Sequence, residues 1–170
     1  MAAAPPWRPG PAEGTGRGRS GPADAGRGLS LRAALDTSVL VSLFWQDAHT
    51  TRAERYMARE RPVLVVSDLA GVEFAATLAR LVRAAAMQRH EAVAVFDLFD
   101  SWTSRESQRV TAMPADLALA TAWIRRLDLN LRAPDAMHLA MAGRLGATMV
   151  TFDDGMAAAA RTLGIPVAEA

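Results

Sequence analysis

The chain contains neither cysteine nor lysine. The missing cysteine excludes disulfide bridges, thiolate zinc sites and cysteine nucleophiles, and it suits a reducing compartment, so we expect a cytoplasmic protein. The missing lysine excludes every reaction that requires that side chain. All positive side chains at neutral pH are therefore arginines, and the formal net charge is only +1.

Long apolar runs are also missing. No run approaches the roughly 20 residues of a membrane span, so the sequence predicts no membrane association. Within residues 1–30, four arginines and two acids give +2, which leaves residues 31–170 near −1. This balance does not support a globally basic nucleic-acid-binding protein. Any contact with nucleic acid must come from local arginine patches or through metal ions.

Residues 1–30 are dominated by Ala, Pro, Gly and Arg. Such a segment cannot bury enough apolar surface to offset the entropy of ordering it, so we expect a disordered tail. It lacks the continuous apolar stretch of a secretory signal. A translation start downstream of it is the alternative. Residues 31–170 are expected to form one domain of ordinary size.

Strand-like and helix-like segments alternate from residue 31 onward. Strands are predicted at 32–37, 63–67, 108–111, 147–151 and 165–168. Helices are predicted at 39–45, 49–59, 69–84, 87–102, 113–127, 134–145 and 155–163. This alternation is typical of an α/β protein in which helices cover both faces of a parallel sheet.

Local signals predict several helix ends. Asp68 is expected to cap the helix 69–84, Pro114 stands in the first turn of its helix, and Gly146 ends the helix 134–145. Asp116 and Asp128 are expected to be exposed helix acids. One apolar face is expected to pack in the core, with a dimer or partner surface as the alternative, and we expect a homodimer. Its residues are Leu78, Leu81, Val82, Val93, Phe96 and Phe99.

Four acids occupy positions where a carboxylate is costly. Asp36 and Asp153 follow strand-like segments, whereas Glu73 and Asp135 lie in apolar helical stretches. Taken singly, each could be a helix cap or a surface acid. Together they could face one crevice beyond the carboxyl ends of the strands. Two carboxylates roughly 5 Å apart repel by about 3 kcal/mol. Such a cluster favours a hard divalent cation such as Mg²⁺, which prefers oxygen ligands.

The segments around these acids carry a family resemblance. They are Asp-Thr-Ser-Val-Leu-Val, Val-Glu-Phe-Ala, Arg-Ala-Pro-Asp-Ala-Met-His-Leu-Ala and Val-Thr-Phe-Asp-Asp. In this order they resemble the PIN-domain ribonucleases, especially the VapC-type toxins, over about residues 32–168. The resemblance implies a three-layer α/β/α fold with a mostly parallel central sheet. It also implies endonucleolytic cleavage of RNA with Mg²⁺, or with Mn²⁺ as the alternative, and a cognate antitoxin as partner.

The resemblance also implies roles for the four acids. Asp36, Glu73, Asp135 and Asp153 would form the catalytic quartet. Asp36 and Asp135 would be direct metal ligands. Glu73 and Asp153 would bind a second ion or hold waters of the first, so the number of metals stays open. These roles agree with phosphodiester hydrolysis assisted by metal ions.

Other side chains are expected to support the quartet. Thr151 would supply the hydroxyl that precedes the last acid, and Ser38 would hold the Asp36 loop. Arg132 would attract phosphate at the rim, with a plain helix-end charge as the alternative. His138 is expected to be a packed or supporting imidazole rather than a catalytic one.

Asp153 and Asp154 are adjacent. Because side chains alternate along an extended backbone, only one of the two is expected to face the crevice. The family pattern favours Asp153, which leaves Asp154 to cap the helix that begins near Gly155.

Competing classes also place acids at strand ends. Haloacid-dehalogenase-type enzymes and response-regulator receivers both need a lysine, which the chain lacks. An RNA-processing PIN nuclease without an antitoxin stays open. A nuclease-inactive PIN scaffold has no support from the sequence, because all four acids are present.

Overall fold

A computed structural model of the chain describes residues 31–168. The strands are β1 (Arg32–Leu35), β2 (Val63–Ser67), β3 (Ser107–Val110), β4 (Thr148–Val150) and β5 (Val167–Ala168). The helices are α1 (Thr37–Phe44), α2 (Thr50–Glu60), α3 (Asp68–Arg83), α4 (Arg89–Glu106), α5 (Pro114–Ile124), α6 (Ala133–Leu145) and α7 (Asp154–Thr162). Residues 1–30, for which the composition predicts a disordered tail, lie outside the described residues. No helix in the described part is long and apolar enough to span a bilayer.

The five strands form one parallel sheet in the order β3-β2-β1-β4-β5. Ala34 of the central strand pairs with Val65 of β2 on one side and with Met149 of β4 on the other. Along the chain, β2 and β3 follow on one side of β1, and β4 and β5 then follow on its other side. The topological switch therefore lies between β1 and β4, where a crevice at the carboxyl edge is expected in such sheets.

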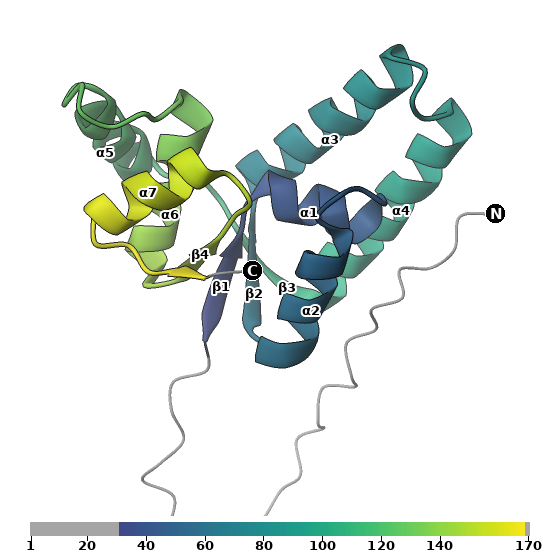
Figure 1. The fold of residues 1–170 in the computed structure, drawn as a ribbon, viewed down its shortest axis with the longest axis horizontal. Helices are drawn as coiled ribbons and strands as arrows, with labels where there is room; N and C mark the ends of the chain where they lie inside the picture. The colour runs from purple at the N-terminus through teal and green to yellow at the C-terminus, as the bar shows by residue number, and fades with distance from the viewer. Residues whose placement is uncertain (1–30, 169–170) are drawn as a thin grey trace, which may run out of the picture.

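Side chains of β1 alternate between two apolar cores. Ala33 and Leu35 belong to the larger core, which β1 shares with α1, α2, α3 and α4. Ala34 packs against the smaller core, which contains Leu139 of α6 and Met156 of α7. In Figure 1, α1–α4 lie to one side of the strands and α5–α7 to the other. This arrangement confirms the predicted three-layer α/β/α class.

Helices α3 and α4 pack side by side and extend away from the sheet (Figure 1). Of the apolar face predicted on these helices, Leu78 and Phe99 are buried, and Leu81, Val82 and Phe96 pack against the core. Phe99 also stacks on Phe74, with ring centroids 4.2 Å apart. Val93 is 51% exposed. Core packing therefore accounts for this face except at Val93.

Two predicted helix ends match the structure and one does not. Pro114 is the first residue of α5, and Gly146 ends α6 in the left-handed conformation with φ 59°. The prediction that Asp68 caps α3 is wrong. Ser67 is the cap, because β2 passes directly into the helix and the Ser67 hydroxyl accepts from the amide of Ala70 at 3.0 Å.

The prediction for Asp116 is also wrong. Its side chain is 2% exposed and accepts two hydrogen bonds from the Arg144 guanidinium, each at 2.8 Å. The Arg144 hydrogen bond, followed by that from the amide of Met113, lowers the pKa of Asp116 against the opposing effect of burial. The pair joins α5 to α6. Asp128 is exposed as predicted and pairs with Arg126, but it lies beyond the end of α5 rather than in a helix.

Candidate active site

Asp36 lies at the carboxyl end of β1, at the topological switch. It is the N-cap of α1, and its Oδ1 accepts from the Thr37 amide at 2.7 Å. Its Oδ2 accepts from the Ser38 hydroxyl at 2.6 Å and from the Thr151 hydroxyl at 2.9 Å. The residue is only 6% exposed. These donors fix both oxygens of a nearly buried carboxylate and partly compensate its desolvation.

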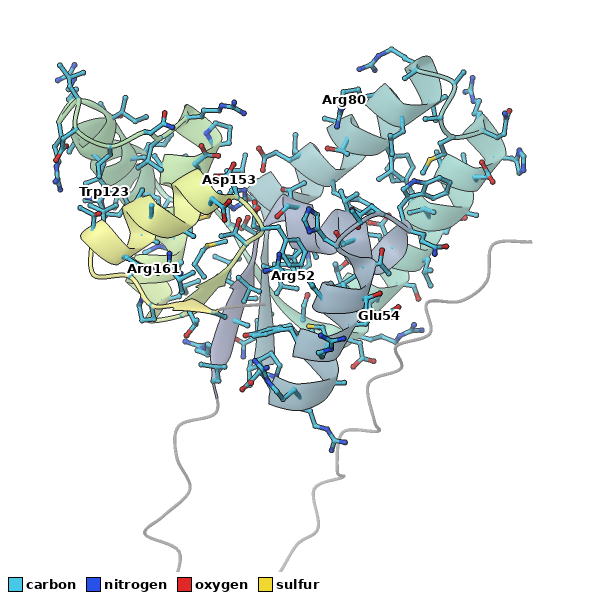
Figure 2. All side chains as sticks on the ribbon, in the orientation of Figure 1. Arg52, Glu54, Arg80, Trp123, Asp153 and Arg161 are labelled. Carbon is cyan, nitrogen blue, oxygen red and sulfur yellow. The ribbon has the colours of Figure 1, made fainter. Side chains whose placement is uncertain are left out.

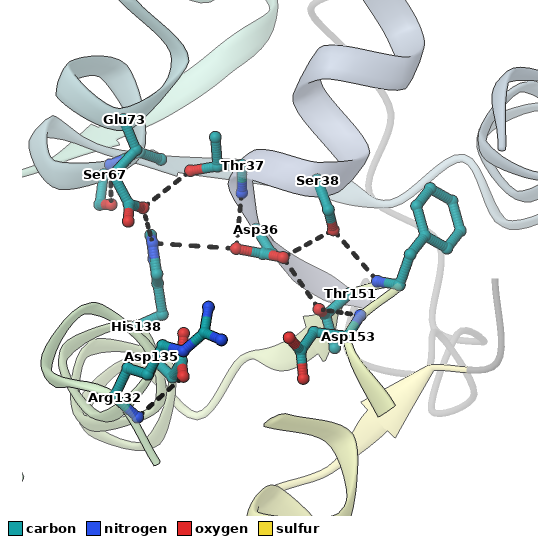
Figure 3. A network of polar contacts seen from close by, with 12 residues as sticks. Asp36, Thr37, Ser38, Ser67, Glu73, Arg132, Asp135, His138, Thr151 and Asp153 are labelled. Carbon is teal, nitrogen blue, oxygen red and sulfur yellow. Dashed lines mark hydrogen bonds and ion pairs between the residues drawn. The ribbon is translucent and has the colours of Figure 1, made fainter. Parts of the chain in front are cut away.

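Ser38 and Thr151 also tie Asp36 to the segment that follows β4. The Ser38 hydroxyl accepts from the amide of Phe152 at 3.1 Å, and the Thr151 hydroxyl accepts from the amide of Asp153 at 3.0 Å. Each hydroxyl therefore donates to Asp36 and accepts from a backbone amide in the segment that follows β4 (Figure 3). The supporting positions predicted for both residues agree with this geometry.

Glu73 reaches the same place from the second turn of α3. Its Oε2 accepts from the Thr37 hydroxyl at 2.9 Å and lies 2.6 Å from Nε2 of His138. Partial burial works to raise the pKa of Glu73, but the hydrogen bond and charge of His138 and the Thr37 hydroxyl outweigh it, so the pKa is lowered. Glu73 is therefore held in its ionised form.

His138 is a nearly buried residue of α6, 4% exposed. Besides its contact with Glu73, its Nε2 lies 3.9 Å from Oδ1 of Asp36. It thus stands between two of the predicted acids, a more central place than its sequence context indicates. The available signal was its position three residues after Asp135 in an otherwise apolar helix.

Asp135 lies one turn before His138, in the first turn of α6. Its Oδ2 accepts from the amide of Arg132 at 2.9 Å. Burial raises the pKa of Asp135, and the negative charges of Asp153 and Asp36 raise it further, although the Arg132 amide and guanidinium oppose them. The charges of Asp153 and Asp36 therefore act on Asp135, which belongs to the same acidic region.

Asp153 and Asp154 do not divide their roles as the sequence predicts. Asp153 itself is the N-cap of α7, since its Oδ1 accepts from the Met156 amide at 2.7 Å. Asp154 is the first helical residue and is exposed. The prediction that Asp154 caps the helix is wrong. The backbone bends directly after Thr151, so strict strand alternation does not extend to these residues.

Comparisons with known proteins show the family of the chain. The family model of the PIN domain matches residues 33–162. Over 136 residues the chain is 33% identical to Ribonuclease VapC46 of Mycobacterium tuberculosis, an alignment that covers 78% of this chain and 93% of that protein. The chain belongs to the PIN-domain family.

Solved structures share the fold of this PIN domain. One is VapC20 of Mycobacterium tuberculosis, described as a sarcin-ricin loop cleaving toxin, with a TM-score of 0.61, 24% identity, and coverage of 75% of this chain and 94% of that chain. Another is FitAcB from Neisseria gonorrhoeae, with a TM-score of 0.63, 15% identity, and coverage of 79% and 95%. At these identities the likeness concerns the fold alone.

The donor atoms of this PIN domain fit a divalent cation. One ligand atom each from Asp36, Glu73 and His138 lies within 4.8 Å of the others. Carboxylate oxygens suit Mg²⁺ and Mn²⁺, whereas imidazole is more typical of softer ions. The geometric group therefore differs from the predicted ligand pair, because it joins Asp36 to Glu73. Asp135 belongs to the same electrostatic region.

Arg132 is the N-cap residue of α6 and is exposed. Figure 3 shows its guanidinium beside Asp135, directed toward the space between α6 and the other acids. A cation in this place partly offsets the negative charge of the PIN-domain site, and it opposes the rise in the pKa of Asp135. This position is compatible with the predicted contact to phosphate.

Proposed function

We propose that this PIN domain is an Mg²⁺-dependent endoribonuclease, with Mn²⁺ as the alternative ion. The carrying observation is the convergence of four acids from separate parts of the chain on one edge of the sheet. Asp36 and Glu73 share a donor group with His138, and the charges of Asp36 and Asp153 raise the pKa of Asp135. This excess of negative charge is what a bound cation relieves.

Asp36 and Asp135 are the proposed ligands, and we propose that Glu73 joins them. When bound, the ion supplies Lewis-acid activation of water and neutralises charge at the phosphodiester. Asp153 offers Oδ2 to the same region, because only Oδ1 is used to cap α7. Arg132 is proposed to attract the RNA phosphate at the rim.

The remaining polar side chains hold these acids in place. Ser38 and Thr151 fix Asp36, whereas Thr37 and His138 fix Glu73. Hydrogen bonds of this kind orient metal-binding carboxylates and are worth about 10- to 100-fold in metal affinity or activity. Side chains of the chain itself thus orient the acids of the site.

The proposal is tested by incubating the purified protein with total RNA, first in EDTA and then with Mg²⁺ or Mn²⁺ in excess. Cleavage that stops in EDTA and resumes with either ion supports the proposal. Undiminished cleavage in EDTA contradicts the metal requirement. If the protein cleaves no RNA under any of these conditions, the result favours a nuclease-inactive PIN scaffold over an enzyme.

We also propose that this enzyme is the toxin of a VapBC-type pair. The support is the 33% identity with Ribonuclease VapC46 over most of both chains. Expression of the protein alone is expected to arrest growth, and co-expression of a small neighbouring gene product is expected to relieve the arrest. Growth without arrest, together with RNase activity in vitro, would instead favour an RNA-processing role.

A homodimer remains part of the proposal. Apolar side chains on the surface of α3 and α5, including Val72 at 67% and Leu117 at 58% exposure, offer area for a protein partner. Light scattering on the purified protein distinguishes a dimer from a monomer by mass.

A further inference from the structure

Three side chains form a stack at the edge of the candidate active site. The rings of His49 and Phe152 are stacked, with centroids 4.7 Å apart and an interplanar angle of 18°. The Arg52 guanidinium lies over the Phe152 ring, 5.0 Å from its centroid. Figure 2 shows Arg52 and Asp153 where α2 approaches the start of α7. The stack therefore joins α2 to the segment that follows β4.

This stack is attached to the carboxylates through the backbone of Phe152. That residue stands between Thr151 and Asp153, and its amide donates to the Ser38 hydroxyl at 3.1 Å. The same hydroxyl donates to Asp36 at 2.6 Å. Movement of the ring is thus limited by the hydrogen bonds that hold the active-site acids, and a molecule touching the stack lies beside those acids.

Hydrogen bonds also hold the backbone at His49. The amide of His49 donates to Oδ1 of Asp47 at 2.8 Å, and the other oxygen of Asp47 accepts from the Ser42 hydroxyl at 2.8 Å. The amide of Asp47 in turn donates to the hydroxyl of Thr50 at 2.8 Å. This network fixes the turn between α1 and α2, so little conformational entropy is left to lose when a ligand contacts His49.

His49 is exposed despite its contact with Phe152. One face of the imidazole lies against the Phe152 ring, so a base stacked on His49 would take the opposite face. A flat aromatic surface, backed by a second ring and a cation, is a type of site on which unpaired nucleobases stack in single-stranded nucleic acids.

We propose that His49 is a stacking platform for an unpaired base of the RNA substrate, beside the acids of the candidate active site. This inference rests on the proposed ribonuclease function and adds a positioning residue to it. Stacking tolerates any base, so His49 contributes affinity and placement rather than sequence choice. The Arg52 guanidinium, which lies over the Phe152 ring, supports the platform.

The test compares four proteins: wild type, His49→Ala, His49→Phe and His90→Ala. His90 is a matched control, since it is an exposed histidine at the start of α4. Binding of a short fluorescein-labelled single-stranded RNA of mixed sequence is measured by anisotropy in EDTA. We expect His49→Ala to weaken binding about tenfold, while His49→Phe and His90→Ala bind like wild type. In the cleavage assay, His49→Ala is expected to raise KM with kcat retained.

Each contrary outcome has a distinct meaning. Equal binding by wild type and His49→Ala overturns the platform and leaves the ribonuclease proposal intact. Binding by His49→Phe as weak as that of His49→Ala overturns stacking as the cause. If none of the four proteins binds RNA and none cleaves it with Mg²⁺ or Mn²⁺, the proposed ribonuclease function is wrong. The proposed role of His49 is then wrong as well. Thermal melting of each variant verifies that all four proteins are folded.

Discussion

Nε2 of His138 lies 2.6 Å from Oε2 of Glu73. This contact joins α6 to α3 at the carboxyl edge of the sheet, between two helices from different layers of the fold. It also keeps the pKa of Glu73 below its ordinary value.

Replacing His138 with alanine is therefore expected to lower cleavage about 10- to 100-fold, as is usual when a supporting partner of a metal-binding group is lost. It is also expected to change the pH dependence. A lowered pKa keeps Glu73 ionised as the pH falls, so without His138 its pKa rises and activity is lost at a higher pH. The pH profile of kcat/KM measures this shift. An unchanged acidic limb would show that Glu73 does not depend on His138.

Asp153 combines two roles that substitution can separate. Asp153→Ala is expected to lower stability by about 1 kcal/mol, because α7 loses its N-cap. Asp153→Ser keeps a capping oxygen and is expected to retain most of that stability, yet lose cleavage with the carboxylate. Asp154→Ala is the control and is expected to change neither property. Denaturation midpoints and Mn²⁺-dependent cleavage rates would together show whether stability and activity separate in this way.

The ion pair between Asp116 and Arg144 is expected to stabilise the domain independently of the active site. Asp116→Asn should lower the free energy of unfolding by about 2 kcal/mol at neutral pH, because hydrogen bonds to charged groups are lost from a buried position. Asp128→Asn, at an exposed acid that also pairs with an arginine, is the control and should have little effect.

The pH dependence of the Asp116 effect has a definite sign. The folded-state pKa of Asp116 is lowered, so its stabilisation is present above the unfolded value of about 4 and is lost as the pH falls through the folded-state pKa. The difference between wild type and Asp116→Asn should therefore shrink in acid. Urea denaturation at neutral and acidic pH measures it, and a constant difference would argue against the ion pair as the cause.

Asp135 should behave in the opposite way to Asp116. Burial and the charges of Asp153 and Asp36 raise its pKa, so the ionised form destabilises the metal-free fold at neutral pH. Asp135→Asn is expected to raise the melting temperature in EDTA and to abolish cleavage in Mg²⁺. A lower melting temperature would show that the hydrogen bond from the Arg132 amide matters more than the repulsion.

Much of this architecture follows from local pattern in the sequence. Alternating strand and helix segments predict the parallel sheet, and acids placed after strands predict which edge carries the site. Helix ends were predictable where one residue type decides them, as at Pro114 and Gly146. The predicted end of α4 at residue 102 is wrong. The helix continues to Glu106, and β3 begins at the next residue.

The errors arise where the outcome depends on residues distant in sequence or on backbone direction. Asp116 is buried because Arg144, 28 residues later, reaches it. His138 contacts Glu73 across 65 residues. Asp153 caps α7 because the backbone leaves its extended path after Thr151, which a rule of alternation cannot anticipate. Contacts between residues far apart in the sequence, and bends of the backbone, become visible only in the folded chain.

The carboxylates around Asp36 are proposed to bind the divalent ion that RNA cleavage requires. Titration of Mn²⁺ into the metal-free protein by calorimetry tests it most directly, with Asp36→Asn as the test variant. Asp97→Asn, at an exposed acid on α4, is the matched control. We predict saturable binding by wild type and Asp97→Asn, and loss of that binding in Asp36→Asn while its circular dichroism spectrum is unchanged. Equal Mn²⁺ binding by all three proteins would contradict the account.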